Sequence, residues 1–79
     1  MQTEIIQKVL EERRRQDEKW GKQDHNVFKW LAILMEEVGE AAQAALEHDG
    51  MGFEEEMIQV IAVGISMLEA FHDGRCGNE

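Results

Sequence analysis

The segment at residues 53–71 constrains the fold of this chain more than any other. At about 100° per residue of an α-helix, its apolar side chains cover nearly the whole circumference, and the remaining polar strip holds only Gln59, Ser66 and Glu69. A helix that is apolar on all sides is a buried helix. Two other helices of a 79-residue chain cannot surround it, so we expect a second copy of the protein to supply the missing contacts.

Two further segments have the apolar periodicity of helices. Residues 3–18 begin with apolar side chains at helical spacing, and Thr3 can cap their start. Residues 27–47 carry a broad apolar stripe, and Asp24 or Asn26 can cap that helix. The chain has no proline, and no segment shows the alternation of a strand, so we predict an all-α protein of three helices.

The stretch "HDGMG" separates the second and third predicted helices. Gly50 and Gly52 lie within three residues of each other, which is typical of a helix stop followed by a tight turn. We therefore predict that the second and third helices form an antiparallel hairpin. This hairpin should assemble with another copy into a four-helix-bundle-like oligomer, a dimer or a tetramer. Residues 1–79 are expected to form a single helical domain, with residues 72–79 as a loose tail.

The charge balance excludes one class of partner. Seventeen acidic residues against eight lysines and arginines give a net charge of −9, whereas binding to a nucleic-acid polymer depends on cations that displace counterions. Polar residues interrupt the most apolar run, so no membrane association is expected. The single cysteine, Cys76, has no intrachain partner, which favours a reducing compartment. We predict a cytoplasmic protein with Cys76 as a free thiol on its surface.

Three glutamates in the stretch "EEVGE", Glu36, Glu37 and Glu40, fall within an arc of about 100° on one face of the second helix. Such a face is often simply solvated. Trp30 and Ile33 lie on the same side, however, which indicates a partly buried face. Close carboxylates repel one another by as much as ~4 kcal/mol at an effective dielectric constant of about 20. A hard divalent cation such as Mg²⁺ would convert this repulsion into affinity.

A fourth carboxylate, Glu56, lies near the start of the third helix. The short turn before that helix would bring Glu56 towards the glutamates of the second helix. The alternative is that Glu54, Glu55 and Glu56 are acids of a first helical turn, where they complement the helix dipole. If the hairpin forms as predicted, Glu36, Glu37, Glu40 and Glu56 make a metal site between two helices.

The spacing of these acids resembles the signature of a known family. The stretch "EEVGE", fifteen intervening residues and then "EMIQV" resemble the E-E-x-x-E... E-x-x-D pattern of the MazG-like, all-α nucleoside triphosphate pyrophosphohydrolases. The upstream stretch "EERRRQDEKWGKQDH" is similar to the corresponding segment of the small MazG-like branch, and the resemblance covers residues 11–70. It implies an oligomer that uses Mg²⁺ or Mn²⁺ to hydrolyse an NTP or dNTP to the monophosphate and pyrophosphate. Such enzymes often clear non-standard or surplus nucleotides.

The resemblance implies that four acids are metal ligands or orient the attacking water: Glu36, Glu37, Glu40 and Glu56. Glu37 or Glu40 would take the proton. The last acid of the family pattern falls on Gln59, whose amide can coordinate a cation but brings no charge and cannot act as a base. The alternative function is therefore a nucleotide-binding or interaction protein of the same fold with weak catalysis.

The candidate substrate-binding residues lie upstream of the acids. Lys19, Lys22 and the run of Arg13, Arg14 and Arg15 are candidates to meet phosphate oxygens, with ordinary solvated side chains as the alternative. Three residues are candidates to stack on or hydrogen-bond a base: Trp20, His25 and Trp30. For Trp30, a role in packing is the favoured interpretation.

A di-iron bundle is a further alternative, because Glu69 and His72 form an E-x-x-H pair. By helical phase, Glu69 points away from Glu56, and His72 lies at the end of the predicted helix. Both positions disfavour this interpretation.

Overall fold

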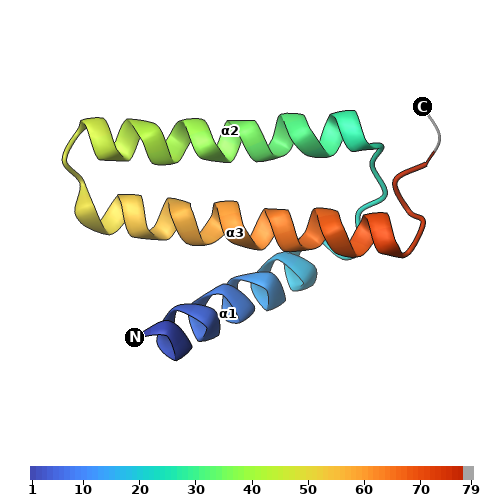
Figure 1. Ribbon diagram of the computed structural model, residues 1–79, viewed down its shortest axis with the longest axis horizontal. Helices are drawn as coiled ribbons and strands as arrows, with labels where there is room; N and C mark the ends of the chain where they lie inside the picture. The colour runs from blue at the N-terminus through green and yellow to red at the C-terminus, as the bar shows by residue number, and fades with distance from the viewer. Residues whose placement is uncertain (78–79) are drawn as a thin grey trace.

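The computed structural model describes residues 1–77, and within that range the protein is all-α (Figure 1). Helix α1 spans Gln2–Trp20, α2 spans Val27–Leu46 and α3 spans Gly50–His72. The prediction of three helices and no sheet is confirmed for these residues. Helix α3 begins before residue 53 because Asp49 caps it: the Asp49 carboxylate accepts a hydrogen bond from the Gly52 amide at 2.9 Å.

The predicted N-capping residues of α2 and α1 can be compared with the structure. Asn26 caps α2, since its side-chain oxygen accepts a hydrogen bond from the Lys29 amide at 2.8 Å. The prediction for Thr3 is wrong, because α1 already begins at Gln2 and Thr3 lies inside its first turn.

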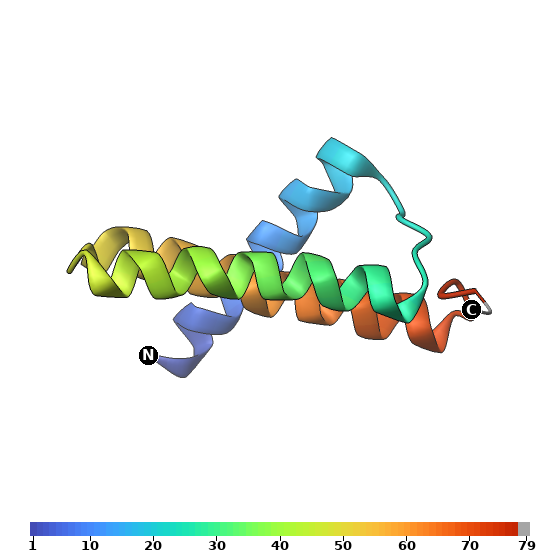
Figure 2. The same cartoon turned by 90° about the horizontal axis from the view of Figure 1, so that it is seen from above.

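Helices α2 and α3 lie side by side and run in opposite directions, while α1 crosses α3 obliquely (Figures 1 and 2). Only three residues, 47–49, connect α2 to α3, and His48 takes a left-handed conformation there with a φ of 56°. Two ion pairs join α1 to α3: Lys8 with Glu54, and Arg13 with Glu69. These contacts fix α1 against α3, with Lys8 near the start of α3 and Arg13 near its end.

The core lies between α2, α3 and the segment after α3. Trp30 is 4% exposed and packs with Val63, Ala70 and Cys76. The interpretation of Trp30 as a packing residue is therefore confirmed. In the later turns of α2, the small side chains of Ala41 and Ala44 are buried, so packing there is close.

The segment after α3 differs from the predicted loose tail. The Arg75 amide donates a hydrogen bond to the Ala70 carbonyl at 2.8 Å, and Gly74 has the positive φ of 71° that this turn requires. The chain therefore folds back, and Cys76 becomes buried at 6% exposure. The prediction of a surface thiol is wrong for this reason. Residues 78–79 of the predicted tail lie outside the described residues.

Much apolar surface stays exposed in the single chain. On α3, Leu68 is 60% and Phe71 58% exposed, and Phe28 and Met35 on α2 are also exposed. No large side chain in residues 1–77 is fully buried. One chain thus leaves parts of the apolar surface of α3 uncovered. None of the helices described has the length and apolarity needed to cross a membrane.

Candidate metal centre and adjoining cavity

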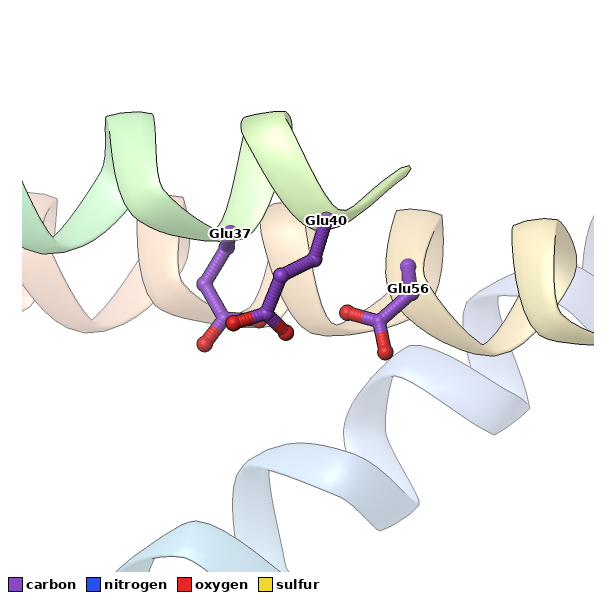
Figure 3. A group of neighbouring side chains, drawn as sticks. All are labelled: Glu37, Glu40 and Glu56. Carbon is purple, nitrogen blue, oxygen red and sulfur yellow. The ribbon is translucent and has the colours of Figure 1, made fainter. Parts of the chain in front are cut away.

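Three carboxylates meet where the second half of α2 faces the first half of α3. Glu37 and Glu40 project from α2 and Glu56 projects from α3, and all three point to one shared space (Figure 3). One oxygen of each lies within 4.8 Å of the others. We call these three residues the acidic cluster. The short connection before α3 explains the meeting, because it sets Glu56 opposite the second half of α2.

The acidic cluster is electrostatically unsatisfied. Glu37 Oε2 and Glu56 Oε2 are buried and have no hydrogen-bond partner among the described residues. Burial raises the pKa of Glu37, and the negative charges of Glu40, Glu56 and Glu36 raise it further. Burial also raises the pKa of Glu56, and a hydrogen bond with Glu40 adds to this increase. The fold therefore holds these groups in positions that disfavour their ionised forms.

This donor set fits a hard divalent cation. Carboxylate oxygens are the ligands that Mg²⁺ and similar ions prefer, and one oxygen from each of three glutamates lies within 4.8 Å of the others here. Within the described residues, the lysines and arginines that form ion pairs do so with other acids. Among residues 1–77, no lysine or arginine forms an ion pair with the acidic cluster.

The two remaining predicted ligands, Glu36 and Gln59, lie beside the acidic cluster. Glu36 is exposed and falls outside the group of three oxygens. Both residues line the same cavity as Glu37. The structure therefore joins Glu37, Glu40 and Glu56 directly and places Glu36 and Gln59 in an adjoining wall.

This cavity has a volume of about 260 Å³ and is lined by all three helices, the loop after α1 and the segment after α3. Its acid end contains Glu36, Glu37 and Gln59, with Arg15 from α1. Its loop end is formed by four residues: Trp20, Lys22, Gln23 and Arg75. Gln59 lies in the first half of α3 and Arg75 follows the end of that helix, so the two ends are separated along α3.

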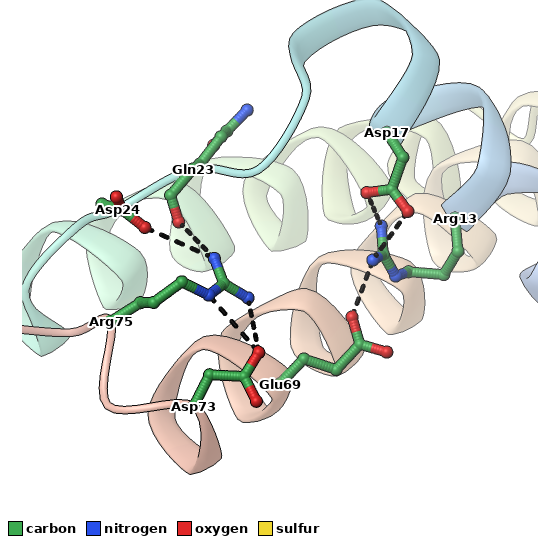
Figure 4. Close-up of polar contacts among 7 residues, drawn as sticks. All are labelled: Arg13, Asp17, Gln23, Asp24, Glu69, Asp73 and Arg75. Atoms are coloured by element: carbon green, nitrogen blue, oxygen red, sulfur yellow. Dashed lines mark hydrogen bonds and ion pairs between the residues drawn. The ribbon is translucent and has the colours of Figure 1, made fainter.

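Near the loop end, two arginines form hydrogen bonds that connect different segments of the chain (Figure 4). Arg75 donates to the Gln23 carbonyl at 3.0 Å and to the Asp24 and Asp73 carboxylates at 3.5 and 3.3 Å. Arg13 donates to both oxygens of Asp17, at 3.1 and 3.2 Å, and to Glu69 at 2.8 Å. We call these two arginines and their partners the arginine network. It fixes the loop between α1 and α2 against the end of α3.

The predicted substrate-binding residues divide into two groups. Trp20, Lys22 and Trp30 line the cavity. Lys19 lies over the Trp20 ring, 4.8 Å from its centre, and the His25 ring packs edge-on against Trp30 with a centre distance of 5.1 Å. Lys19 and His25 therefore support cavity residues. The Trp30 indole nitrogen is buried and has no hydrogen-bond partner in residues 1–77.

The three predicted arginines also differ. Arg13 and Arg15 line the cavity, whereas Arg14 is exposed to solvent. Glu69 pairs with Arg13 and thus takes part in the arginine network. The placement of Glu69 argues against the di-iron interpretation, which needs this residue among the other acids.

Several residues of the site were missed in the sequence. Arg75 was assigned to a loose tail, and no periodic or spacing signal could have linked it to Gln23. Glu12 on α1 is near enough to Glu37 that its charge contributes to the raised pKa of Glu37. Gln16 is buried and lines the cavity. The apolar pattern of α1 stops at Leu10, so periodicity gave no orientation for the residues beyond it.

Compared with known proteins, the chain matches no family model, no curated protein and no solved structure. The acidic cluster and the cavity beside it are therefore the observations on which a function can be argued.

Proposed function

We propose that the protein is a metal-dependent pyrophosphohydrolase that converts an NTP or dNTP to the monophosphate and pyrophosphate. The observation that carries this proposal is the acidic cluster, in which three carboxylate oxygens lie within 4.8 Å of one another and two buried oxygens have no partner in the part of the chain that the structure describes. Glu37 belongs both to the acidic cluster and to the cavity wall, so a cation held there would adjoin a ligand in the cavity. Clearance of surplus or non-standard nucleotides is the role that we propose for this activity.

Glu37, Glu40 and Glu56 would hold Mg²⁺ or Mn²⁺. When bound, the ion would neutralise phosphate charge and polarise the attacked phosphoryl group. Glu37 is our first candidate to accept the proton of the attacking water, because it belongs to the acidic cluster and also lines the cavity. Glu40 is the second candidate for this step. Gln59 can donate or accept a hydrogen bond at the acid end but cannot take a proton.

The two ends of the cavity suit the two halves of a nucleotide. The phosphates belong at the acid end, beside the acidic cluster. The base belongs at the loop end, where the exposed Trp20 ring offers a stacking surface. Trp30 also lines the cavity and adds apolar ring surface to its wall.

We further propose that the hairpin of α2 and α3 pairs with the same hairpin of a second copy, giving a dimer or a tetramer of four-helix-bundle type. The exposed apolar residues Ile61, Leu68 and Phe71 on α3 support this proposal, and Phe28 and Met35 on α2 extend the surface. A second copy of the same chain is the occupant that a symmetric assembly would place there. Sedimentation at micromolar concentration should give a species larger than the monomer, and a compact monomer would refute this part.

A second function is favoured by one specific observation. Gln59 supplies an uncharged amide at the acid end, which lowers the negative charge available to a cation. The alternative is therefore a protein of the same fold that binds nucleotides and turns them over weakly.

The test is pyrophosphate release from each common and damaged dNTP with Mg²⁺ and with Mn²⁺. Wild type should release pyrophosphate, and Glu40→Gln should lose this activity by about a hundredfold or more while the oligomer stays intact. Glu47→Gln is the matched control, because Glu47 is an exposed acid at the end of the same helix. Undiminished release from Glu40→Gln would refute the assignment. Nucleotide binding without release from any substrate would support the alternative.

A further inference from the structure

The run of Arg13, Arg14 and Arg15 places three identical side chains in three different surroundings. The Arg13 side chain is 12% exposed and is committed to Asp17 and Glu69. Arg14 faces solvent. The Arg15 side chain is 52% exposed and lines the cavity. Arg15 is therefore the member of the run that is both beside the cavity and accessible to a ligand.

Arg15 has a partner that it can exchange. Its Nε and Nη2 atoms donate to the two carboxylate oxygens of Glu12 at 2.9 and 2.7 Å, three residues away on the same helix. In this pair the Arg15 side chain is 52% exposed and that of Glu12 only 13% exposed, so Arg15 can turn towards a ligand while Glu12 stays in place. Glu12 also accepts a hydrogen bond from Gln16 at 3.1 Å, so it keeps a partner when Arg15 turns away. In the described residues, Arg15 makes hydrogen bonds to Glu12 alone.

The position of Arg15 suits the phosphate end of a ligand. Arg15 and Gln59 together line both the cavity and a second hollow between α1 and the first half of α3. Lys22 and Arg75 instead line a hollow near the end of α3. Among the basic residues of the cavity wall, Arg15 is thus the one at the acid end.

A positively charged side chain at the acid end would offset the negative charge that a bound polyphosphate adds there. A polyphosphate carries more negative charge than one divalent ion neutralises, and Glu36, Glu37, Glu40 and Glu56 add to it. Arg13 and Arg75 are held by the arginine network. The planar guanidinium of Arg15 already accommodates two carboxylate oxygens, and the same fork matches two oxygens of a phosphate.

We infer that Arg15 binds the polyphosphate by exchanging the Glu12 carboxylate for phosphate oxygens. Glu12 acts as the resident counterion, which holds the guanidinium in place until the ligand arrives. This inference rests on the proposed function, because it assigns the phosphate-binding residue of the same site.

Binding of inorganic tripolyphosphate, pyrophosphate and phosphate, each with excess Mg²⁺, tests this assignment without a base or a turnover step. Calorimetric titration should show that Arg15→Met weakens tripolyphosphate binding by about tenfold or more, as expected for a charge-assisted hydrogen bond. The loss should shrink from tripolyphosphate to phosphate. Arg15→Lys, which keeps the charge without the fork, should recover only part of the affinity.

Two variants separate this contact from a general charge effect. Arg14→Met removes the same charge from the next position, and it should change the affinity by less than about twofold. Glu12→Gln removes the competitor of the phosphate and should tighten binding, but only when Arg15 is present. Helix content measured by circular dichroism shows that each variant is folded.

Equal losses of tripolyphosphate affinity in Arg14→Met and Arg15→Met would overturn the assignment of Arg15 as the phosphate-binding residue. Weaker tripolyphosphate binding by Glu12→Gln would overturn it as well. Absence of tripolyphosphate binding by wild type would overturn it too, while pyrophosphate release from an NTP would still uphold the hydrolase. Conversely, binding that depends on Arg15, without pyrophosphate release from any NTP, would reject the hydrolase and support the Arg15 contact.

Discussion

The acidic cluster and the arginine network use similar carboxylates in opposite ways. In the arginine network, Asp17 and Glu69 both accept hydrogen bonds from Arg13. In the acidic cluster, Glu37 and Glu56 each keep a buried oxygen that has no partner within residues 1–77. One region is neutralised by the chain itself, and the other is not.

Under the proposed function, this difference distinguishes acids that hold the fold together from acids that bind a ligand. A paired carboxylate beside a partly buried arginine ties two elements together, and here it holds α1 to α3. A group of unpaired carboxylates costs stability, because burial and mutual repulsion disfavour the ionised forms. Such an arrangement is typical of sites that a ligand completes. The comparison predicts that substitutions in the two regions change stability in opposite directions.

The largest effect is expected for Trp30, which anchors the core under the loop end. Trp30→Ala should lower the free energy of unfolding by about 3–5 kcal/mol, because it opens a cavity against Val63 and Ala70. Urea denaturation measures this loss, and Trp30→Phe should cost clearly less because it keeps an aromatic ring. Similar costs for both variants would show that the core does not depend on ring packing here.

A smaller loss is expected in the arginine network. Arg13→Met should lower the free energy of unfolding by about 1–2 kcal/mol, because Asp17 and Glu69 lose a charge-assisted partner. Arg14→Met serves as the control, since Arg14 is exposed, and should be nearly neutral. If both variants unfold at the same urea concentration, the link between α1 and α3 does not contribute to stability.

In the acidic cluster, we expect a substitution to raise the free energy of unfolding, not lower it. Without divalent cations at pH 7, Glu37→Gln should raise the free energy of unfolding by less than about 1 kcal/mol, a figure reduced for the partial exposure of this side chain. Excess Mg²⁺ should reverse the order of thermal stability, because only wild type gains a bound ion. A destabilised Glu37→Gln variant in metal-free buffer would contradict the repulsion argument.

The higher stability that we expect of Glu37→Gln over wild type in metal-free buffer should depend on pH. The pKa of Glu37 is raised above its ordinary value of 4.5 in the folded protein, so the folded state binds a proton more readily than the unfolded chain. Its contribution to stability therefore falls as the pH rises through the raised pKa, and the advantage of the variant should vanish below the ordinary value. Metal-free thermal unfolding from pH 4 to pH 8 measures this effect.

The contribution of Glu12 to stability should depend on pH in the opposite way to that of Glu37. A hydrogen bond from Arg15 lowers the pKa of Glu12, so its contribution is present above the ordinary value and is lost as the pH falls through the lowered pKa. Glu12→Gln should thus cost stability near neutral pH and cost less in acid. Parallel pH profiles for Glu12→Gln and Glu37→Gln would contradict the distinction between paired and unpaired acids.

The helices and the acidic cluster could be predicted because they depend on local periodicity. Helical phase sets Glu37 and Glu40 on one face of α2, and the break in the apolar pattern at residues 48–52 indicates where the chain turns towards Glu56. The turn itself is made at His48, whereas Gly50 and Gly52 belong to the first turn of α3. The structure places these three carboxylates together. Glu36 shares their phase but lies outside the group of three oxygens and lines the adjoining cavity instead.

The loop end could not be predicted because it depends on contacts between distant parts of the chain. Arg75 bonds to the Gln23 carbonyl only after a turn at Gly74 folds the chain back. The same turn buries Cys76, whose lack of a cysteine partner says nothing about exposure. Arg13 meets Glu69 and Arg15 lines the cavity, which depends on how α1 packs against α3, and the sequence of α1 alone does not specify this packing. Figure 2 shows α1 crossing α3 obliquely.

The most direct test of the central claim is a titration with Mn²⁺ followed by electron paramagnetic resonance, comparing Glu37→Gln, Glu40→Gln and Glu56→Gln with wild type. Glu69→Gln serves as the control from the arginine network, since its carboxylate already has an arginine partner. We predict that wild type and Glu69→Gln bind Mn²⁺ alike, and that each of the other three variants binds it about tenfold or more weakly. Equal Mn²⁺ affinity in all five proteins would contradict the assignment of the acidic cluster as a metal site.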